Sequence, residues 1–490
     1  MNFRLALKQP ATRQSVNLVG IVLAVAVAAF LVTNDWLGAA GVIVLWAGWQ
    51  FLPNIGGPPM LQLAFTHQWV QVFLGVYYHG VTGRKLEAIE MSDYRPMVMI
   101  GMGCLVALLV GLVVGVKLFN RAFKTETELL AESLSLRVLV IGYAVSFAVV
   151  GGVSALAWQI PGFTQAIISL SFLRLALLFL LLRKLVWPKL QTPWIVLILS
   201  LEVVIGITGF FAGFREPLAI ATIVLLERFN AKSFRHWAVF GGMAAAALFL
   251  AVLWTAVKVD YRSKFVSDEA FANSTETRLS YIGAALGKFV SGEGGQVADQ
   301  MDALVDRLWV VYYPALAVSR VPKELPHTDG EILQSALLHV VTPRFLFPEK
   351  AGLRSDSEMV RKYSGIWVAG GDDGTNAEND TSIAFGYAAE SYLDFGVPWM
   401  FVPVLIWGVV MGLLYGLFFR LIVHRELAIA VGTVIFWLSL YIFERSWVKT
   451  LGQSATLIVY LTVVTVLVDR FLLSQKSSST ISVVRRMAIG

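Results

Sequence analysis

The sequence predicts an all-α, polytopic integral membrane protein, and three of its features support this fold class. The chain is 57% hydrophobic and only 15% charged, whereas soluble domains have about 25% charged residues. Apolar runs recur along most of its 490 residues, and at roughly 17–25 residues each can cross a bilayer core of about 30 Å. The runs are continuous and lack the alternation that a membrane β-barrel needs, so we expect helices as the spanning elements.

Twelve runs qualify as spans, nine before a long polar segment and three after it. They cover residues 15–33, 37–54, 60–80, 96–118, 134–158, 165–183, 194–213, 217–230, 236–257, 397–421, 427–444 and 453–473. The third run is interrupted by His67, Gln68, Gln71 and His79, and an interfacial position is the alternative for it. The eighth run is short.

Basic residues orient these spans. They cluster before the first span, between the fourth and fifth, after the sixth, eighth and tenth, and in the tail. With twelve spans and a cytoplasmic N-terminus, every one of these clusters lies in the cytoplasm, as the positive-inside rule requires. The prediction is therefore a multi-pass membrane protein with both termini cytoplasmic.

The chain divides into four parts on this basis. Residues 1–257 form an N-terminal transmembrane bundle, 258–396 a large outer (periplasmic) loop, 397–473 three C-terminal transmembrane helices, and 474–490 a basic cytoplasmic tail. The loop holds 13 Lys and Arg against 20 Asp and Glu, which agrees with an outer location. We expect helices within it at 277–291, 298–320 and 330–342.

Several classes of function lack support in the sequence. Cys104 is the single cysteine, so an intrachain disulfide is impossible. The chain has no H-E-x-x-H, Walker or paired C-x-x-C motif, so we expect no metal, nucleotide or other cofactor. The net charge of +6 is explained by cytoplasmic loops rather than by nucleic-acid binding.

Basic residues on the outer face form the first candidate site. Arg215 ends the stretch GFFAGFR beside a Gly-rich break, and four more basic residues follow within the loop: Arg344, Lys350, Arg354 and Arg361. Guanidinium groups bind phosphate in bidentate fashion and Lys adds a point charge, so the group predicts an anion site. The alternative is that Arg215 extends to the membrane interface and the loop arginines pair with nearby carboxylates.

Two charged residues lie inside spans, Arg174 in the sixth and Glu202 in the seventh. A charge in hydrocarbon is costly and normally faces a partner or a cavity. Their depths, at about 1.5 Å per residue, are similar enough for the two side chains to pair. A structural ion pair and a proton relay both remain open.

Two residues could act as a general base, which needs a His or a carboxylate. His339 lies in the apolar run SALLHVV, and Glu390 lies in AAESYLDFG, four residues before Asp394. Glu390 and Asp394 share one helix face, where they could bind substrate or simply be solvated. His339 could equally be a packing histidine.

The order of these features resembles that of the Wzy-type polysaccharide polymerases, which join oligosaccharide repeat units in bacterial envelopes. Three stretches carry the resemblance: GFFAGFR, TPRFLFPEK from Pro343 to Lys350, and GYAAESYLDFG late in the loop. The spacing from Arg354 to Gly365 also resembles an Arg-x10-Gly pattern of such loops. The resemblance implies a GT-C-like membrane glycosyltransferase fold.

The resemblance also implies a location in the bacterial inner (plasma) membrane and a reaction at its periplasmic face. The partners would be undecaprenyl-pyrophosphate-linked oligosaccharides, membrane lipid, a chain-length regulator and a flippase. The five basic residues would hold the leaving pyrophosphate, and His339 or Glu390 would activate the attacking hydroxyl. The alternatives are an O-antigen-ligase-like transferase, a transporter or flippase of lipid-linked sugars, and a non-catalytic assembly or sensor subunit with an outer ligand-binding loop.

Overall fold

The protein is described here by a computed structural model. It covers residues 14–471, apart from 56, 123–133, 161–163, 187–189, 208–212, 228, 231, 268–274, 292–296, 343–345, 348–354 and 367–382. Over these residues all the regular secondary-structure elements are helices, and there is no β-strand. The all-α class predicted from the sequence is therefore confirmed for the part of the chain that is described.

The helices follow the apolar runs closely. In chain order they are α1 (Gln14–Thr33), α2 (Trp36–Phe51), α3 (Met60–Thr82), α4 (Glu87–Met91), α5 (Arg95–Ala122), α6 (Leu136–Gln159), α7 (Thr164–Ser171), α8 (Leu173–Val186), α9 (Thr192–Ile207), α10 (Arg215–Leu226), α11 (Phe234–Ser267), α13 (Thr275–Ser291), α14 (Val297–Leu308), α15 (Tyr312–Arg320), α16 (Glu331–Val341), α17 (Asp356–Ser364), α18 (Tyr387–Phe395), α19 (Phe401–Leu421), α20 (Arg425–Leu440), α21 (Trp447–Thr456) and the π-helical turn η2 (Leu457–Leu461).

Five segments are long and apolar enough to cross a membrane, among the residues described. They are Arg95–Asn120, Thr164–Val186, Phe234–Val257, Phe401–Leu421 and Trp447–Phe471. Shorter apolar helices occupy other predicted spans, such as Trp36–Phe51 and Thr192–Gly206. Each of the twelve predicted spans contains a helix, but twelve crossings remain a prediction.

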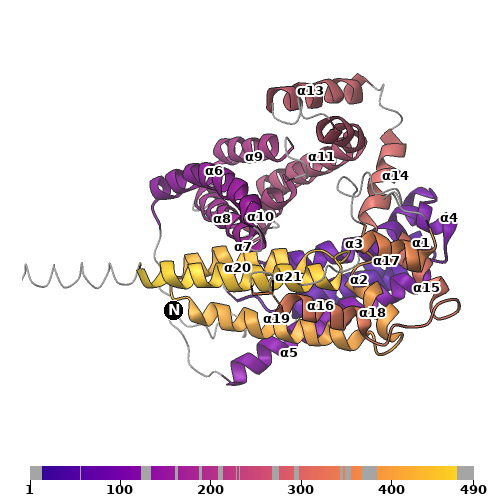
Figure 1. Cartoon of the computed structure of the whole chain (residues 1–490). Helices are drawn as coiled ribbons and strands as arrows, with labels where there is room; N and C mark the ends of the chain where they lie inside the picture. The colour runs from indigo at the N-terminus through magenta and orange to yellow at the C-terminus, as the bar shows by residue number, and fades with distance from the viewer. Residues whose placement is uncertain are drawn as a thin grey trace, which may run out of the picture.

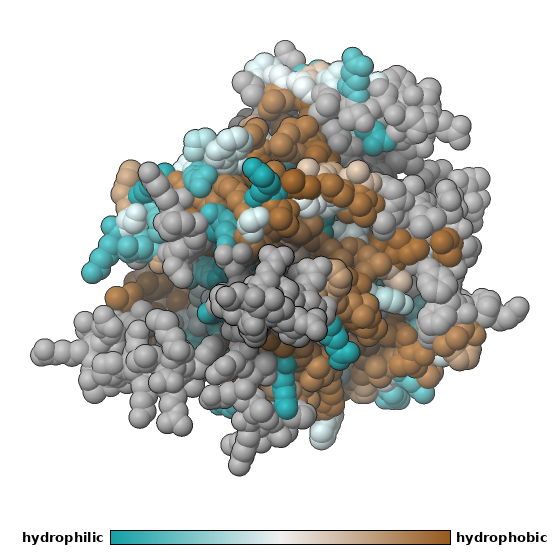
Figure 2. Space-filling view, turned by 90° about the vertical axis from the view of Figure 1, so that its left-hand side faces the viewer, coloured by the Kyte–Doolittle hydropathy of each residue, from teal (hydrophilic) through white to brown (hydrophobic). Residues whose placement is uncertain are grey.

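The outer surface of the bundle is apolar, as expected where lipid is the solvent. Broad hydrophobic areas reach the surface in the view of Figure 2, with hydrophilic residues in smaller groups between them. On α1, for example, Ile21, Val27 and Leu31 are 59%, 57% and 71% exposed. Charged residues are rare on such faces because hydrocarbon does not solvate them.

The most extensive interface between two helices of the described residues, that of α5 with α19, is packed through glycines. A methyl group added at Gly111 of α5 would lie 2.4 Å from the backbone oxygen of Leu405, and one added at Gly412 of α19 would lie 2.5 Å from that of Leu112. Small residues let helix backbones approach closely where no hydrophobic driving force acts between helices. These glycines therefore set the distance between the N-terminal bundle and the C-terminal helices.

The segment between α11 and α19 contains several helices, of which α14, α15, α17 and α18 gather at one end of the bundle, whereas α13 lies apart from them beside α11 (Figure 1). The single helix expected at 298–320 is wrong, because the chain breaks between α14 and α15. The indole of the intervening Trp309 packs on Gly75 of α3, and its Nε1 donates to the backbone oxygen of Val72 over 2.8 Å. The backbone N–H of Val310 donates to the oxygen of Gln71 over 3.3 Å. This tertiary anchoring interrupts the helix.

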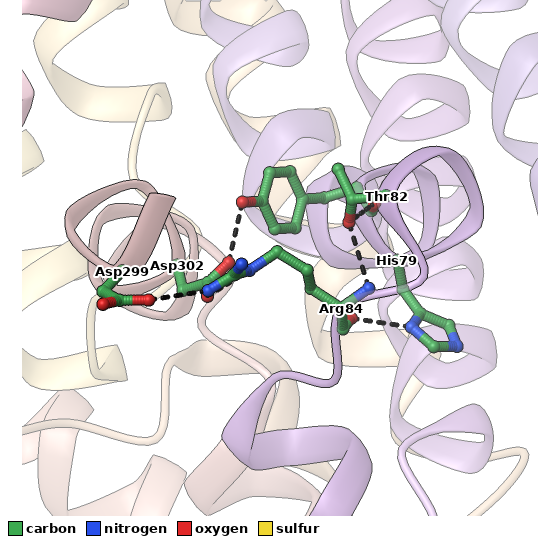
Figure 3. A network of polar contacts seen from close by, with 6 residues as sticks. His79, Thr82, Arg84, Asp299 and Asp302 are labelled. Carbon is green, nitrogen blue, oxygen red and sulfur yellow. Dashed lines mark hydrogen bonds and ion pairs between the residues drawn. The ribbon is translucent and has the colours of Figure 1, made fainter. Parts of the chain in front are cut away.

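An ionic network adds a second anchor between α3 and α14 (Figure 3). The Arg84 guanidinium donates to Asp302 over 2.5 Å and to Asp299 over 2.8 Å. The Tyr78 hydroxyl donates to the other oxygen of Asp302 over 2.7 Å. The Arg84 backbone is held in turn by the side chains of Thr82 and His79. The network and Trp309 together hold the outer helices in a fixed position on the bundle.

Candidate functional site

The centre of the candidate site is the connection between α20 and α21, residues Tyr441–Ser446, which we call the α20–α21 linker. Polar side chains of α3 hold it. Gln68 donates to the backbone oxygen of Leu440, and Gln71 accepts from the N–H of Phe443 over 2.5 Å. His67 Nδ1 donates to the oxygen of Tyr441 over 2.8 Å. The polar residues that make the third span unusual therefore satisfy a buried backbone turn.

A basic cluster lies on one side of this linker. Arg215 is the first residue of α10, and its side chain is 56% exposed. Its Nη2 lies 3.7 Å from Glu216 Oε1, which also accepts from the Tyr441 hydroxyl over 3.3 Å. The second arginine, Arg445, is 9% exposed. Its guanidinium carbon lies 5.7 Å from the centre of the Tyr441 ring.

The two arginines are close enough to influence each other. Burial, with the neighbouring Arg215 charge as a further cause, lowers the pKa of Arg445 from its ordinary value. The side chain stays protonated, because arginine is effectively never deprotonated in proteins. Glu216 and Glu444 supply the compensating charge near Arg215. A bound anion is a further way to relieve the repulsion between two guanidinium groups.

Arg215 also stands where its charge is least favourable within its own helix. It is the first residue of α10, and the positive end of a helix macrodipole disfavours a cation there. The same dipole favours an anion. The position therefore suits an arginine that meets an anionic ligand better than one that stabilises the helix.

A cavity of about 230 Å³ lies between α16, α17, α18 and α21, the helix that follows the linker. Its lining residues are Thr328, Glu331, Ile332, Ser335, Ala336, Asp356, Met359, Tyr363, Glu390 and Val448. Three carboxylates and three hydroxyl groups are among them. This lining can accept and donate several hydrogen bonds, as a polyhydroxylated ligand such as a sugar requires.

Glu390 is the most perturbed carboxyl group of the cavity. It is 5% exposed, and Oε2 accepts from the backbone N–H of Trp447 over 2.7 Å. Burial raises its pKa to about 8, and the carboxylates of Asp356 and Asp394 act in the same direction. Only a hydrogen bond from Trp447 and the charge of Lys449 oppose this. Glu390 is therefore protonated at neutral pH but close to its titration point.

The charge of the Asp356 carboxylate is balanced by Lys449. Its Oδ2 lies 2.5 Å from Lys449 Nζ, which comes from the first turn of α21. This pair joins α17 to α21 across the cavity. The three carboxylates of the lining are thus unequal: Asp356 is paired with Lys449, Glu390 holds a proton, and Glu331 lies on the exposed first turn of α16.

Asp394, expected from the sequence as a substrate-binding residue, is engaged in holding a helix. It is fully buried, and its carboxylate accepts from the Thr328 hydroxyl over 2.5 Å. It also accepts from the backbone N–H groups of Ile332 and Leu333 over 3.0 and 2.8 Å. These groups are in the first turn of α16, so Asp394 caps that helix from α18. The solvated face considered for Glu390 and Asp394 is not observed, because both are buried.

The other expected site residues are placed as follows. Arg344, Lys350 and Arg354 lie outside the described residues. Arg361 is in the last turn of α17. His339 is in the last turn of α16 and is not among the residues that line the cavity. The structure thus brings Glu390 to a cavity and Arg215 to a second arginine, and it does not bring His339 to either.

Arg174 and Glu202 form the pair that their depths suggested. One nitrogen of Arg174 lies 2.6 Å from each carboxylate oxygen of Glu202. The Tyr143 hydroxyl donates to Glu202 Oε1 over 2.5 Å, and the Arg174 guanidinium lies 4.8 Å from the Phe147 ring centre. The pair joins α6, α8 and α9 and is distant in sequence from the linker.

The sequence analysis missed Arg445, Lys449 and the role of the α3 glutamines. A signal for the first two was present: FERSWVK, residues 443–449, places three charged residues between two apolar runs. The role of Gln68 and Gln71 had no such signal, because their partners are backbone groups more than 370 residues away.

Chemically, the linker holds Arg445 near Arg215, and the start of α21 that follows it contacts the protonatable Glu390 at a polar cavity. The described residues contain no group of three or more His, Cys, Asp or Glu side chains that could hold a metal. No curated protein and no solved structure matches the sequence. Residues 94–450, most of the chain, match a family described as a domain of unknown function (DUF8712). This range includes Arg215, Glu390, Arg445 and Lys449, and the chain belongs to the DUF8712 family.

Proposed function

We propose that this protein is a membrane glycosyltransferase that polymerises lipid-linked oligosaccharide repeat units. Its substrates would be undecaprenyl-pyrophosphate-linked glycans at the periplasmic face of a bacterial inner membrane. The product would be O-antigen or an exopolysaccharide. A chain-length regulator and a flippase would be its partners. The resemblance of the GFFAGFR, TPRFLFPEK and GYAAESYLDFG stretches to Wzy-type polymerases supports this assignment.

One observation carries the proposal: the linker holds Arg445 near Arg215, and the helix that follows it starts against a buried carboxyl group at a sugar-sized cavity. Arg215 and Arg445 are suited to the charge of a pyrophosphate. Glu390 is suited to exchange a proton with a hydroxyl group near neutral pH, because its pKa is about 8. Glycosyl transfer from a lipid pyrophosphate needs both functions.

The proposed reaction is a displacement at the anomeric carbon of the donor glycan. A hydroxyl oxygen of the acceptor sugar forms the new bond, and its proton passes to Glu390 in its ionised form, which is the minor form at neutral pH because the pKa is about 8. The bond between the anomeric carbon and the pyrophosphate oxygen breaks, and the electron pair leaves with the lipid pyrophosphate. Arg215 and Arg445 stabilise the charge that develops on this leaving group, which is where electrostatic catalysis is strongest.

The test is the length of the glycan in a deletion strain that carries variants at equal membrane levels. Arg445→Ala and Glu390→Gln should each leave single repeat units, with losses of about 10²–10³-fold for the arginine and about 10²–10⁴-fold for the base. Arg235→Ala is the matched control, because Arg235 is in the first turn of α11 and donates to the backbone oxygen of Leu190, away from the linker.

The same experiment separates the other candidate functions. Long glycans left on the carrier lipid in the deletion strain would show a ligase. Repeat units retained on the inner leaflet would show a transporter or flippase. Glycan of normal length and attachment in the deletion strain would refute the proposed function.

A further inference from the structure

Helix α16 has two faces of different character. Glu331, Ile332, Ser335 and Ala336 line the cavity beside α18. The next part of the helix exposes Leu337, Leu338 and Val341, whose exposed fractions are 46%, 56% and 67%. Exposed leucines in a contiguous group on a helix of an outer segment need an explanation, because such patches mark interaction sites.

The apolar character continues past the end of α16. Leu346 and Phe347, in the turn that follows, are 63% and 49% exposed. Just before α19, Trp399 is 68% exposed. An exposed Trp at the end of a span is typical of the membrane–water interface. Helix α18, which holds the first turn of α16, therefore leads into a part of the protein where such an interface is expected.

The position of α16 against α21 gives its depth. Val340 Cγ2 lies 3.7 Å from where a methyl group on Gly452 would stand. Gly452 is five residues into the Trp447–Phe471 candidate span, which is about 7 Å below its first residue at about 1.5 Å per residue. The other end of α16 is capped by Asp394 of α18, which precedes α19. Helix α16 thus lies alongside the Trp447–Phe471 candidate span, and its C-terminal end is the deeper one.

We propose that Leu337, Leu338, Val341, Leu346 and Phe347 insert into the acyl chains of the adjacent leaflet. We call this group the α16 apolar face. Lipid is the occupant that fits, because the face continues the surface of a candidate membrane span and carries exposed aliphatic and aromatic side chains. The polar side of the same helix lines the cavity, so the cavity stands next to the lipid surface. A lipid-linked ligand then has a short lateral route from the leaflet to Glu390.

The insertion itself does not depend on the proposed function, and it can be tested on the full chain in liposomes. Cys104, the single cysteine, is buried, so the parent chain serves as the unlabelled control. Leu338→Cys and Val341→Cys would each be labelled with an environment-sensitive fluorophore. Quenching would be measured with brominated acyl chains in the bilayer and with iodide in the water.

Two reference positions calibrate the result. Val463→Cys, 53% exposed within the Trp447–Phe471 span, is the lipid reference. Lys323→Cys, exposed between α15 and α16, is the water reference. We expect both α16 labels to be quenched by brominated chains as at residue 463, to be insensitive to iodide, and to shift to blue emission relative to residue 323.

Two outcomes would overturn the insertion. Quenching by iodide as strong as at residue 323 would place the α16 apolar face in water. Protection from both quenchers would mean that a protein, either a partner or a second copy, covers the face. Leu337→Cys is the second variant if either of the first two fails to reach the membrane.

Discussion

The backbone N–H of Trp447 donates to Glu390 Oε2 over 2.7 Å, which joins the first turn of α21 to α18. The indole of Trp447 also donates to the Ser391 hydroxyl over 2.9 Å. Glu390 thus substitutes for a capping residue at the start of α21 while its carboxyl group borders the cavity. Its protonation state therefore affects both the stability of this junction and the chemistry proposed beside it.

The first prediction concerns stability and pH. The pKa of Glu390 is about 8 in the folded protein against an ordinary value of 4.5, so the folded state binds a proton that the unfolded state loses. The contribution of this group is complete below about pH 4.5 and is lost as the pH rises to about 8. The free energy of unfolding should decrease by up to about 1.4 kcal/mol per pH unit in that window.

Thermal unfolding in detergent at pH 5 and pH 8 measures this dependence. Glu390→Gln keeps an acceptor for the Trp447 N–H but does not titrate, so its loss of melting temperature over the same range should be smaller than that of the wild type. Equal losses in the two proteins would show that Glu390 does not titrate in this window.

The second prediction concerns the α3 residues that hold the linker. Gln71→Leu removes the acceptor of the buried Phe443 N–H, which should cost about 1–3 kcal/mol of stability. Because the linker carries Arg445, glycan polymerisation should fall as well. Gln62→Leu is the matched control: Gln62 is also on α3 and buried, but it donates to Leu52 at the other end of the helix.

Melting temperature and glycan length together check this prediction. Both variants should lower the melting temperature, and only Gln71→Leu should shorten the glycan at equal membrane levels. A loss of glycan with Gln62→Leu as large as with Gln71→Leu would mean that the defect is general destabilisation and not displacement of the linker.

The sequence was sufficient to predict the helices, because each apolar run of span length also has to satisfy its own backbone in lipid. The sequence was less informative where tertiary contacts determine the end of a helix or the role of a side chain. The break between α14 and α15 depends on Trp309 packing on Gly75, a pair separated by more than 230 residues. Asp394 looked like a ligand-binding carboxylate because the cap that it forms belongs to another helix, α16.

In the candidate site, too, some residues could be predicted from the sequence and others depend on tertiary contacts. Arg215 and Glu390 could be chosen from residue type and from their place at span ends. Arg445 lies between two apolar runs and was overlooked, although FERSWVK is unusually charged for its surroundings. Its proximity to Arg215 brings the start of α10 near the end of α20, and no local sequence pattern encodes that.

The third prediction concerns the α5–α19 interface. Gly412→Leu places side-chain atoms where the Leu112 oxygen already stands, 2.5 Å from the position of a methyl group. Overpacking of this kind costs about 1–3 kcal/mol, occasionally more. Gly242→Leu on α11 is the control, because nothing lies within 4 Å of a methyl group there. The melting temperature should fall for Gly412→Leu and stay near wild type for Gly242→Leu.

Retention of the wild-type melting temperature by Gly412→Leu would contradict the close approach of α5 and α19. A comparable fall for both variants would instead reflect an effect of leucine in a helix of this membrane protein and would leave no special role for the glycine contact.

The last prediction separates the two roles left open for Arg174 and Glu202. Removal of one partner of a buried ion pair leaves an unpaired charge and costs about 3–5 kcal/mol, whereas replacement of both by apolar residues is often neutral. If the pair is structural, Arg174→Met should lower the melting temperature strongly, and Arg174→Met with Glu202→Leu should recover most of the loss together with glycan polymerisation. If the pair relays protons, the double variant should be stable but inactive.

Tyr143→Phe adds a finer test, because it removes only the hydroxyl that donates to Glu202 over 2.5 Å. In a structural pair this change should cost about 0.5–1.5 kcal/mol and leave glycan length unchanged, since the Arg174 contact at 2.6 Å persists.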